Sequence, residues 1–174
     1  MIIWLTGMSG SGKTTLSNIL IKKFRKKKIN FISVDGDVIR DLFNNDLTHS
    51  LKHRLIQIQR IKKITKFLDS QKQNVIVSAL YSNSKILQDN KKIFKNYFEI
   101  YLKVPMSVLL NRDIKNLYKR ALKKKIKNVV GVDIVWNEPK NSNLIIDQSK
   151  KTDPYRVAEK IILNLINERN KFKF

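Results

Sequence analysis

The sequence predicts an α/β fold of three layers (αβα), in which a parallel sheet of five strands lies between helices. Short apolar runs alternate along the chain with longer amphipathic stretches, and a glycine-rich loop joins the first run to the first stretch. The length of 174 residues suits one domain over residues 1–174, with no internal repeat or linker. The hydrophobic fraction of 42% is typical of a globular chain.

Five apolar runs qualify as strands because each is short and rich in Ile, Val, Leu or aromatic residues. They are residues 2–6, 30–34, 74–80, 98–104 and 143–146. Because amphipathic stretches separate them, we expect the strands to run parallel and to bind ligands beyond their carboxyl ends.

The amphipathic stretches predict the helices in order. They are residues 14–28, 50–70, 83–94, two helices within 105–125, and a last helix that begins with Asp153 as N-cap and Pro154 as its first residue. Residues 112–139 are polar and basic with a weak helical pattern, and we expect them to form a helical lid.

The glycine-rich loop fits the pattern G-x-x-x-x-G-K-[ST] over Gly7–Thr14. It lies where a strand must turn sharply into a helix, so its backbone N–H groups and the helix dipole would form an anion site. Lys13 would contact the β- and γ-phosphates as a catalytic group, and the Thr14 hydroxyl would ligate Mg²⁺. The predicted ATP-binding residues of the loop are Gly7, Met8, Ser9, Gly10, Ser11, Gly12, Lys13, Thr14 and Thr15.

Two carboxylates follow the second predicted strand, in Asp35-Gly36-Asp37, and Arg40 comes one helical turn later. One carboxylate would hold Mg²⁺, and the other would accept a proton from an attacking hydroxyl. Arg40 would clamp an anionic substrate through its forked guanidinium. The alternative is an ordinary Asp-Gly turn, with Arg40 on a solvated helix face.

Other nucleotide-binding classes fit less well. The chain has no Asn-Lys-x-Asp for guanine, and the third predicted strand ends in Val77-Ser78-Ala79-Leu80 without an acid. A P-loop kinase acting on a small molecule, with ATP and Mg²⁺ as cofactors, therefore fits better than a regulatory GTPase or a motor ATPase.

The composition also bears on compartment and partners. The chain has no Cys, and its first apolar run is too short for a signal peptide or a membrane span, so we expect a cytoplasmic protein without membrane contact. The net charge of +22 would attract polyanions, and a basic, nucleotide-regulated RNA-binding protein is the alternative of another class. The lysine runs lack interleaved aromatics, which argues against nucleic acid as a partner.

Four motifs in order resemble the adenylylsulfate (APS) kinase family, from about residue 1 to residue 147. They are the phosphate loop, Asp35-Gly36-Asp37-Val38-Ile39-Arg40, the segment from Arg112 to Ala121 with its Arg-Asp-x-Lys-x-Leu-Tyr string, and the segment from Ile126 to Asp133. The resemblance implies that ATP phosphorylates the ribose 3′-hydroxyl of a nucleotide, and that the protein could be a homodimer.

The resemblance also implies roles for single residues. Asp37 would orient or deprotonate the hydroxyl, which leaves Asp35 as the candidate beside Thr14 for the metal and as a further substrate contact. The implied contacts to the substrates come from loops and the lid. They are Arg40 and Arg54 at the anionic end of the acceptor, Ser82 in a substrate loop, Lys115 and Lys127 on the lid, and Arg112 near the ATP base.

The departures from the family pattern all concern the pocket for the acceptor base. His49 and Val129 stand where the family has two Phe that stack on adenine, Gln57 replaces an Asn, and Tyr81 alters the loop usually written Ile-Ser-Pro. Each aromatic stack is worth about 1–3 kcal/mol, so adenine binding should be weaker.

The motifs for phosphoryl transfer are therefore retained, whereas the residues of the base pocket differ from the family pattern. The chain resembles a divergent member of the family that phosphorylates cytidine diphosphoramidate for capsule polysaccharide modification. The alternative is an authentic APS kinase of sulfate assimilation.

Overall fold

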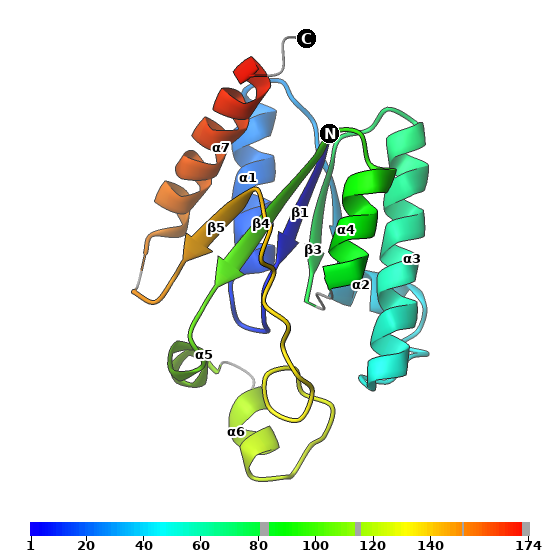
Figure 1. Ribbon diagram of the computed structural model, residues 1–174, viewed down its shortest axis with the longest axis vertical. Helices are drawn as coiled ribbons and strands as arrows, with labels where there is room; N and C mark the ends of the chain where they lie inside the picture. The colour runs from blue at the N-terminus through cyan, green and yellow to red at the C-terminus, as the bar shows by residue number, and fades with distance from the viewer. Residues whose placement is uncertain (81–83, 114–115, 151, 172–174) are drawn as a thin grey trace.

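The computed structural model describes residues 1–80, 84–113, 116–150 and 152–171, and Figure 1 shows their arrangement. The strands are β1 (Ile2–Thr6), β2 (Ile32–Asp35), β3 (Val75–Ala79), β4 (Tyr97–Lys103) and β5 (Leu144–Asp147). The helices are α1 (Lys13–Lys26), α2 (Gly36–Leu42), α3 (Leu51–Ser70), α4 (Ser84–Ile93), α5 (Met106–Arg112), α6 (Leu117–Leu122) and α7 (Pro154–Lys171).

The strands form one parallel sheet in the order β2-β3-β1-β4-β5, with β1 at its centre. All five β1 residues are fully buried, and their side chains alternate between the two faces of the sheet. Ile3 and Leu5 pack in a cluster with α1 and α7, and Ile2 and Trp4 pack in a second cluster with α3 and α4. Helices therefore cover both faces, which confirms the predicted three layers (Figure 1).

The predicted elements agree with the structure apart from their ends and one helix. Asp153 accepts the N–H of Tyr155 at 3.0 Å, and α7 begins at Pro154, as expected for an N-cap and first helical position. Among the described residues, α2 is the helix that the apolar pattern missed. It has seven residues, and it starts because the Asp35 carboxylate accepts the N–H of Asp37 at 2.9 Å.

Helix α6 and the loop after it lie beyond the end of the sheet toward which the strands run (Figure 1). They belong to the segment predicted as a lid, residues 112–139. We call it the lid segment. The phosphate loop after β1 and the acidic motif after β2 reach the same edge, because the carboxyl ends of parallel strands point one way.

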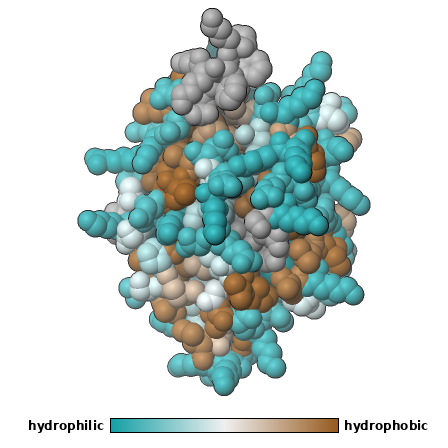
Figure 2. Space-filling view, viewed as in Figure 1, coloured by the Kyte–Doolittle hydropathy of each residue, from teal (hydrophilic) through white to brown (hydrophobic). Residues whose placement is uncertain are grey.

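Hydrophilic side chains cover much of the face in Figure 2, with separate hydrophobic patches between them. This agrees with the 36 Lys and Arg residues of the chain. Across the described ranges, no helix has the length and apolar character that a bilayer crossing requires.

Candidate active site

Two glycines shape the phosphate loop. A Cβ on Gly7 would lie 2.8 Å from the carbonyl oxygen of Leu102, so only glycine fits against β4 there. Gly12, directly before α1, has φ of 90°, a left-handed conformation that favours glycine. The loop therefore turns the chain from the central strand into the N-terminus of α1, where backbone N–H groups can meet an anion.

The Lys13 amine closes the phosphate loop from inside. It donates to the carbonyl oxygens of Gly7 at 2.8 Å and Met8 at 2.9 Å. Burial lowers the pKa of Lys13 to about 8, against the opposing effect of the nearby Asp37 and Asp35 carboxylates. A bound phosphate would supply the negative charge that the amine lacks, so nucleotide binding should raise this pKa again.

A pH dependence of nucleotide affinity follows from Lys13. Above about pH 8 the amine of the free protein loses its proton, while the complex keeps it, so binding must take up a proton. We expect the Kd of Mg²⁺-AMPPNP, measured by calorimetry between pH 7 and pH 9.5, to rise by up to about ten-fold per unit above pH 8. Lys13→Arg keeps its charge over this range and should remove the rise; an equal rise in this variant would contradict the assignment.

Thr14, Asp35 and Asp37 form a linked set at the start of α1 and α2. The Thr14 hydroxyl donates to Asp35 Oδ2 at 2.7 Å, while Asp35 Oδ1 accepts the N–H of Asp37. Asp35 is half-buried and Asp37 is exposed toward the site. Hydroxyl and carboxylate oxygens are ligands that suit Mg²⁺. The ion commonly binds one or two carboxylates and completes its coordination shell with phosphates and water. Thr14 and Asp35 therefore fit the metal that the sequence predicted.

Arg40 is buried and holds the loop between α2 and α3. Its Nη1 donates to the carbonyl oxygen of Leu47 at 3.0 Å. Burial lowers its pKa, with the Asp37 charge acting in the opposite direction. The same loop is braced at its surface by Arg60, which contacts both carboxylate oxygens of Asp46 at 2.6 and 2.8 Å. The loop that carries His49 is therefore fixed from both sides.

A cavity of about 720 Å³ brings the predicted residues together. Its lining comes from the phosphate loop, the acidic motif, α3 and the lid segment. The predicted residues that line it are Ser9, Gly10, Gly12, Lys13, Thr14, Thr15, Asp35, Asp37, Arg40, His49, Arg54, Gln57, Lys127 and Val129. A volume of several hundred Å³ is in the range of small-molecule sites.

Another part of the cavity wall comes from α3 and the lid segment. Arg54 and Gln57 are three residues apart on α3 and therefore share a face of that helix. Arg54 Nη2 donates to the carbonyl oxygen of Asn128 at 2.8 Å, which joins α3 to the lid segment. Gln57 is 5% exposed and its Nε2 donates to the carbonyl oxygen of Gly36 at 3.0 Å.

The two positions at which the family has a stacking Phe differ in their surroundings. His49 is exposed and lines the cavity, and desolvation together with the charges of Arg40 and Arg54 lowers its pKa. Its ring is therefore neutral at pH 7. Val129 is 4% exposed and packs with Met8, among others, in the cluster beneath the lid segment.

Some predicted residues lie elsewhere. Gly7, Met8 and Ser11 belong to the loop but do not line the cavity, while Arg112 ends α5 and donates to Gln148 Oε1 at 3.2 Å. The proposed place of Arg112 near the ATP base stays a prediction. Tyr81, Ser82 and Lys115 lie outside the described residues.

Two residues in motifs quoted for the family proved to connect parts of the site, which the sequence did not indicate. The Tyr118 hydroxyl donates to the carbonyl oxygen of Ser9 at 2.9 Å and so joins α6 to the phosphate loop. Burial raises the pKa of Tyr118 to about 12, so the hydroxyl stays protonated as a donor. The other is Asn128, whose carbonyl holds Arg54. Such contacts have no local pattern, because they join residues more than 70 positions apart.

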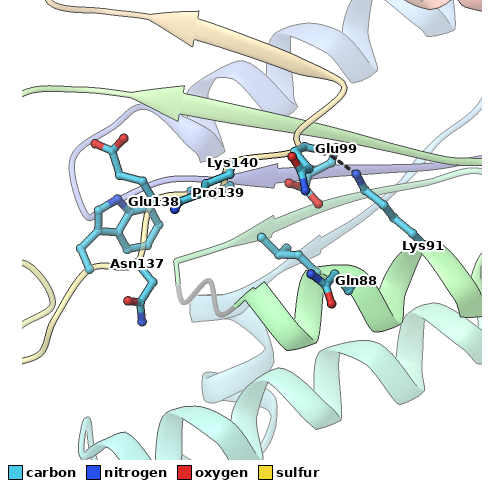
Figure 3. Close-up of a pocket in the computed structure, with 10 residues that line it drawn as sticks. Gln88, Lys91, Glu99, Asn137, Glu138, Pro139 and Lys140 are labelled. Atoms are coloured by element: carbon cyan, nitrogen blue, oxygen red, sulfur yellow. Dashed lines mark hydrogen bonds between the residues drawn. The ribbon is translucent and has the colours of Figure 1, made fainter.

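A second cavity, of about 360 Å³, lies between α4 and residues 136–141, where the lid segment ends and the chain continues toward β5 (Figure 3). Its buried carboxylate, Glu99 on β4, accepts from the hydroxyls of Tyr97 at 3.1 Å and Ser142 at 2.7 Å. Lys91 of α4 donates to the carbonyl oxygen of Asn141. No predicted site residue lines this cavity, and its contacts tie the chain after the lid segment to the sheet.

Comparison with known proteins places these features in a family. The family described as adenylylsulphate kinase matches residues 1–147. Cytidine diphosphoramidate kinase of Campylobacter jejuni is 40% identical over 164 residues, which are 94% of this chain and 95% of that protein. A probable adenylyl-sulfate kinase of Pyrococcus abyssi is 34% identical and covers 92% of this chain and 91% of its own length.

Solved structures agree with the sequence comparison. The APS kinase of Mycobacterium tuberculosis in complex with AMPPNP and APS superposes with a TM-score of 0.86 at 27% identity, over 95% of this chain and 96% of that one.

Proposed function

The chain belongs to the adenylylsulphate kinase family and is a nucleotide kinase, and we propose that it transfers the γ-phosphoryl group of ATP to the ribose 3′-hydroxyl of cytidine diphosphoramidate. The observation that carries the proposal is the shared cavity, which the phosphate loop lines together with Arg40, Arg54, His49 and Val129. The 40% identity to a cytidine diphosphoramidate kinase supports the choice of acceptor.

In the proposed mechanism the chain holds both substrates and supplies little covalent chemistry. Lys13 and the loop N–H groups stabilise the charge on the transferring phosphoryl group. Asp37 lines the cavity near Lys13 and accepts a hydrogen bond from the acceptor hydroxyl, which orients the oxygen for in-line attack. Thr14 and Asp35 would hold Mg²⁺, which supplies charge neutralisation at the β- and γ-oxygens.

Arg40 and Arg54 would hold the anionic end of the acceptor, and closure of the lid segment would exclude water from the transfer. The ring of His49 and the small Val129 would form the base pocket. A pocket without two stacking Phe suits a pyrimidine better than adenine, since the larger purine gains more from stacking.

The acceptor is tested by measuring ADP release with cytidine diphosphoramidate and with APS at matched concentrations. We expect kcat/KM for the cytidine compound to be higher by about ten-fold or more, since each lost stack on adenine removes about 1–3 kcal/mol. Preferred turnover of APS at micromolar concentration would overturn this acceptor. It would support authentic APS kinase activity, the alternative that the adenylyl-sulfate kinases among the relatives favour.

His49→Phe should move the specificity toward APS. A Phe at this exposed position would restore one face of the adenine stack, worth about 1–3 kcal/mol, so we expect the KM for APS to fall by about five-fold or more. The control is Lys52→Phe, which places a Phe at an exposed position on the first turn of α3, outside the cavity lining. The same change at Val129 is a poorer test, because this side chain is buried and a larger ring would overpack its cluster.

Three further parts of the proposal concern context. We place the reaction in the cytoplasm, where ATP is available, and its product in capsule polysaccharide modification. We also propose a homodimer, which light scattering at micromolar protein concentration tests. RNA binding is the alternative function of another class. It requires an association constant for RNA that falls steeply as the salt concentration rises.

A further inference from the structure

We propose that Asp133, which does not line the cavity, is a positioning residue that fixes Arg54 for the anionic end of the acceptor. The inference rests on the proposed function in one respect, that Arg54 contacts this end. It adds a residue for which the sequence predicted no role.

The Asp133 carboxylate closes the loop in front of it. Oδ2 accepts the N–H of Asn128 at 2.5 Å, and Oδ1 accepts the N–H of Val129 at 2.6 Å. Partial desolvation acts to raise the pKa of Asp133, but these backbone N–H groups outweigh it and hold the pKa below its usual value. The carboxylate is therefore charged at neutral pH. Asn128 has φ of 68°, a left-handed conformation that Asn adopts more readily than most other residues, and it turns the loop so that its N–H meets the carboxylate.

The same loop holds Arg54 from its other side. The N–H of Asn128 is bound by Asp133, and its carbonyl oxygen accepts from Arg54 Nη2 at 2.8 Å. Asn128 thus connects the Asp133 carboxylate, through its N–H, to the Arg54 guanidinium, through its carbonyl oxygen. Arg54 lines the cavity and Asp133 does not, so Asp133 acts on the acceptor through Arg54.

Loss of the carboxylate should loosen this connection without unfolding the chain. Asp133 is exposed, so water can replace it at a freed N–H of the loop. Asn has nearly the same size as Asp, so the substitution removes no apolar contact from the core clusters. The expected consequence is a displaced Arg54, which would weaken the binding of the anionic end of the acceptor.

Asp133→Asn tests the inference. The amide keeps one acceptor oxygen, but an NH2 group replaces the other oxygen and, as a donor, cannot bind the second backbone N–H. With cytidine diphosphoramidate and APS as probes, we expect the KM of the better acceptor to rise by about ten-fold, while kcat and the KM of ATP stay within about two-fold, as for a loss of acceptor binding alone. In an Arg54→Lys background the same change should add less than about two-fold, since the two residues act as a unit. The matched control is Asp153→Asn, which alters a carboxylate that also accepts a backbone N–H, far from the cavity.

A second measurement does not depend on turnover. The Arg54 side-chain Nε–Hε signal in ¹⁵N NMR, assigned by its loss in Arg54→Lys, should be sharp in the parent and in Asp153→Asn and broadened in Asp133→Asn. If Asp133→Asn fails to fold, Asp133→Glu keeps both oxygens on a longer side chain and should show the same changes to a smaller degree.

The results separate the two proposals. A parent chain that phosphorylates neither probe overturns the proposed function, and the Arg54 signal still decides the inference. An unchanged Arg54 signal in Asp133→Asn overturns the inference, and so does an equal rise in acceptor KM in Asp153→Asn.

Discussion

Replacing Asp37 by asparagine is expected to lower kcat by about 100-fold or more while the KM of ATP stays within about two-fold. The carboxylate lines the cavity on the first turn of α2, close enough to Lys13 to act on its pKa. An amide of the same shape can still contact a hydroxyl, but it cannot take its proton. Because ATP is held by the phosphate loop, the loss should fall on the transfer step. Initial rates of ADP release with a saturating acceptor measure it.

Asp41→Asn is the matched control, because Asp41 lies on the same helix, is exposed and does not line the cavity. Its side chain accepts from Asn45 Nδ2 at 3.0 Å, a contact that an asparagine can partly keep. We expect the control to turn over at the parental rate. Parental turnover by Asp37→Asn would show that the assigned role of this carboxylate is wrong.

The second large effect is expected for Lys13→Ala, which should lower kcat/KM for ATP by about 1,000-fold. The amine is the one side-chain cation of the phosphate loop, and its place inside the loop puts it where the β- and γ-oxygens would bind. In contrast to Asp37→Asn, both binding and transfer should suffer, because the ammonium contacts the phosphates in the ground state and in the transition state.

Lys22→Ala is the control for Lys13→Ala, since Lys22 is an exposed lysine on the same helix. Melting temperatures of both variants should lie near the parental value. Lys22 is exposed, and in Lys13→Ala the relief of placing a desolvated ammonium in the fold opposes the loss of its hydrogen bonds to Gly7 and Met8. ATP turnover by Lys13→Ala within ten-fold of the parent would remove the phosphate loop from the mechanism.

Much of the fold could be predicted from the sequence, because its signals are local. The run from Ile2 to Thr6 is apolar on both faces, as a central parallel strand must be. The glycines and lysine that follow it specify a sharp strand-to-helix turn. Helix α2 was missed because its start depends on a contact, the Asp35 carboxylate on the N–H of Asp37, within a pattern that also fits a plain turn.

The sequence predicted which residues form the candidate site better than it predicted which of them contact one another. The cavity lining includes Arg40, Arg54 and Lys127, but the sequence did not indicate that Arg40 and Arg54 each hold a backbone carbonyl of a loop. Their guanidinium groups therefore shape the wall of the cavity as well as its charge.

The sequence by itself determined the phosphate loop, the acidic motif and the alternating elements, since each depends on residue types at fixed spacings of a few positions. Only the tertiary structure decided how the parts are joined: Thr14 to Asp35, Tyr118 to Ser9, and Arg54 through Asn128 to Asp133. Most of these contacts close loops of 20 to more than 100 residues. The packing of the whole sheet brings the two ends of each loop within hydrogen-bonding distance, and no local sequence pattern encodes this.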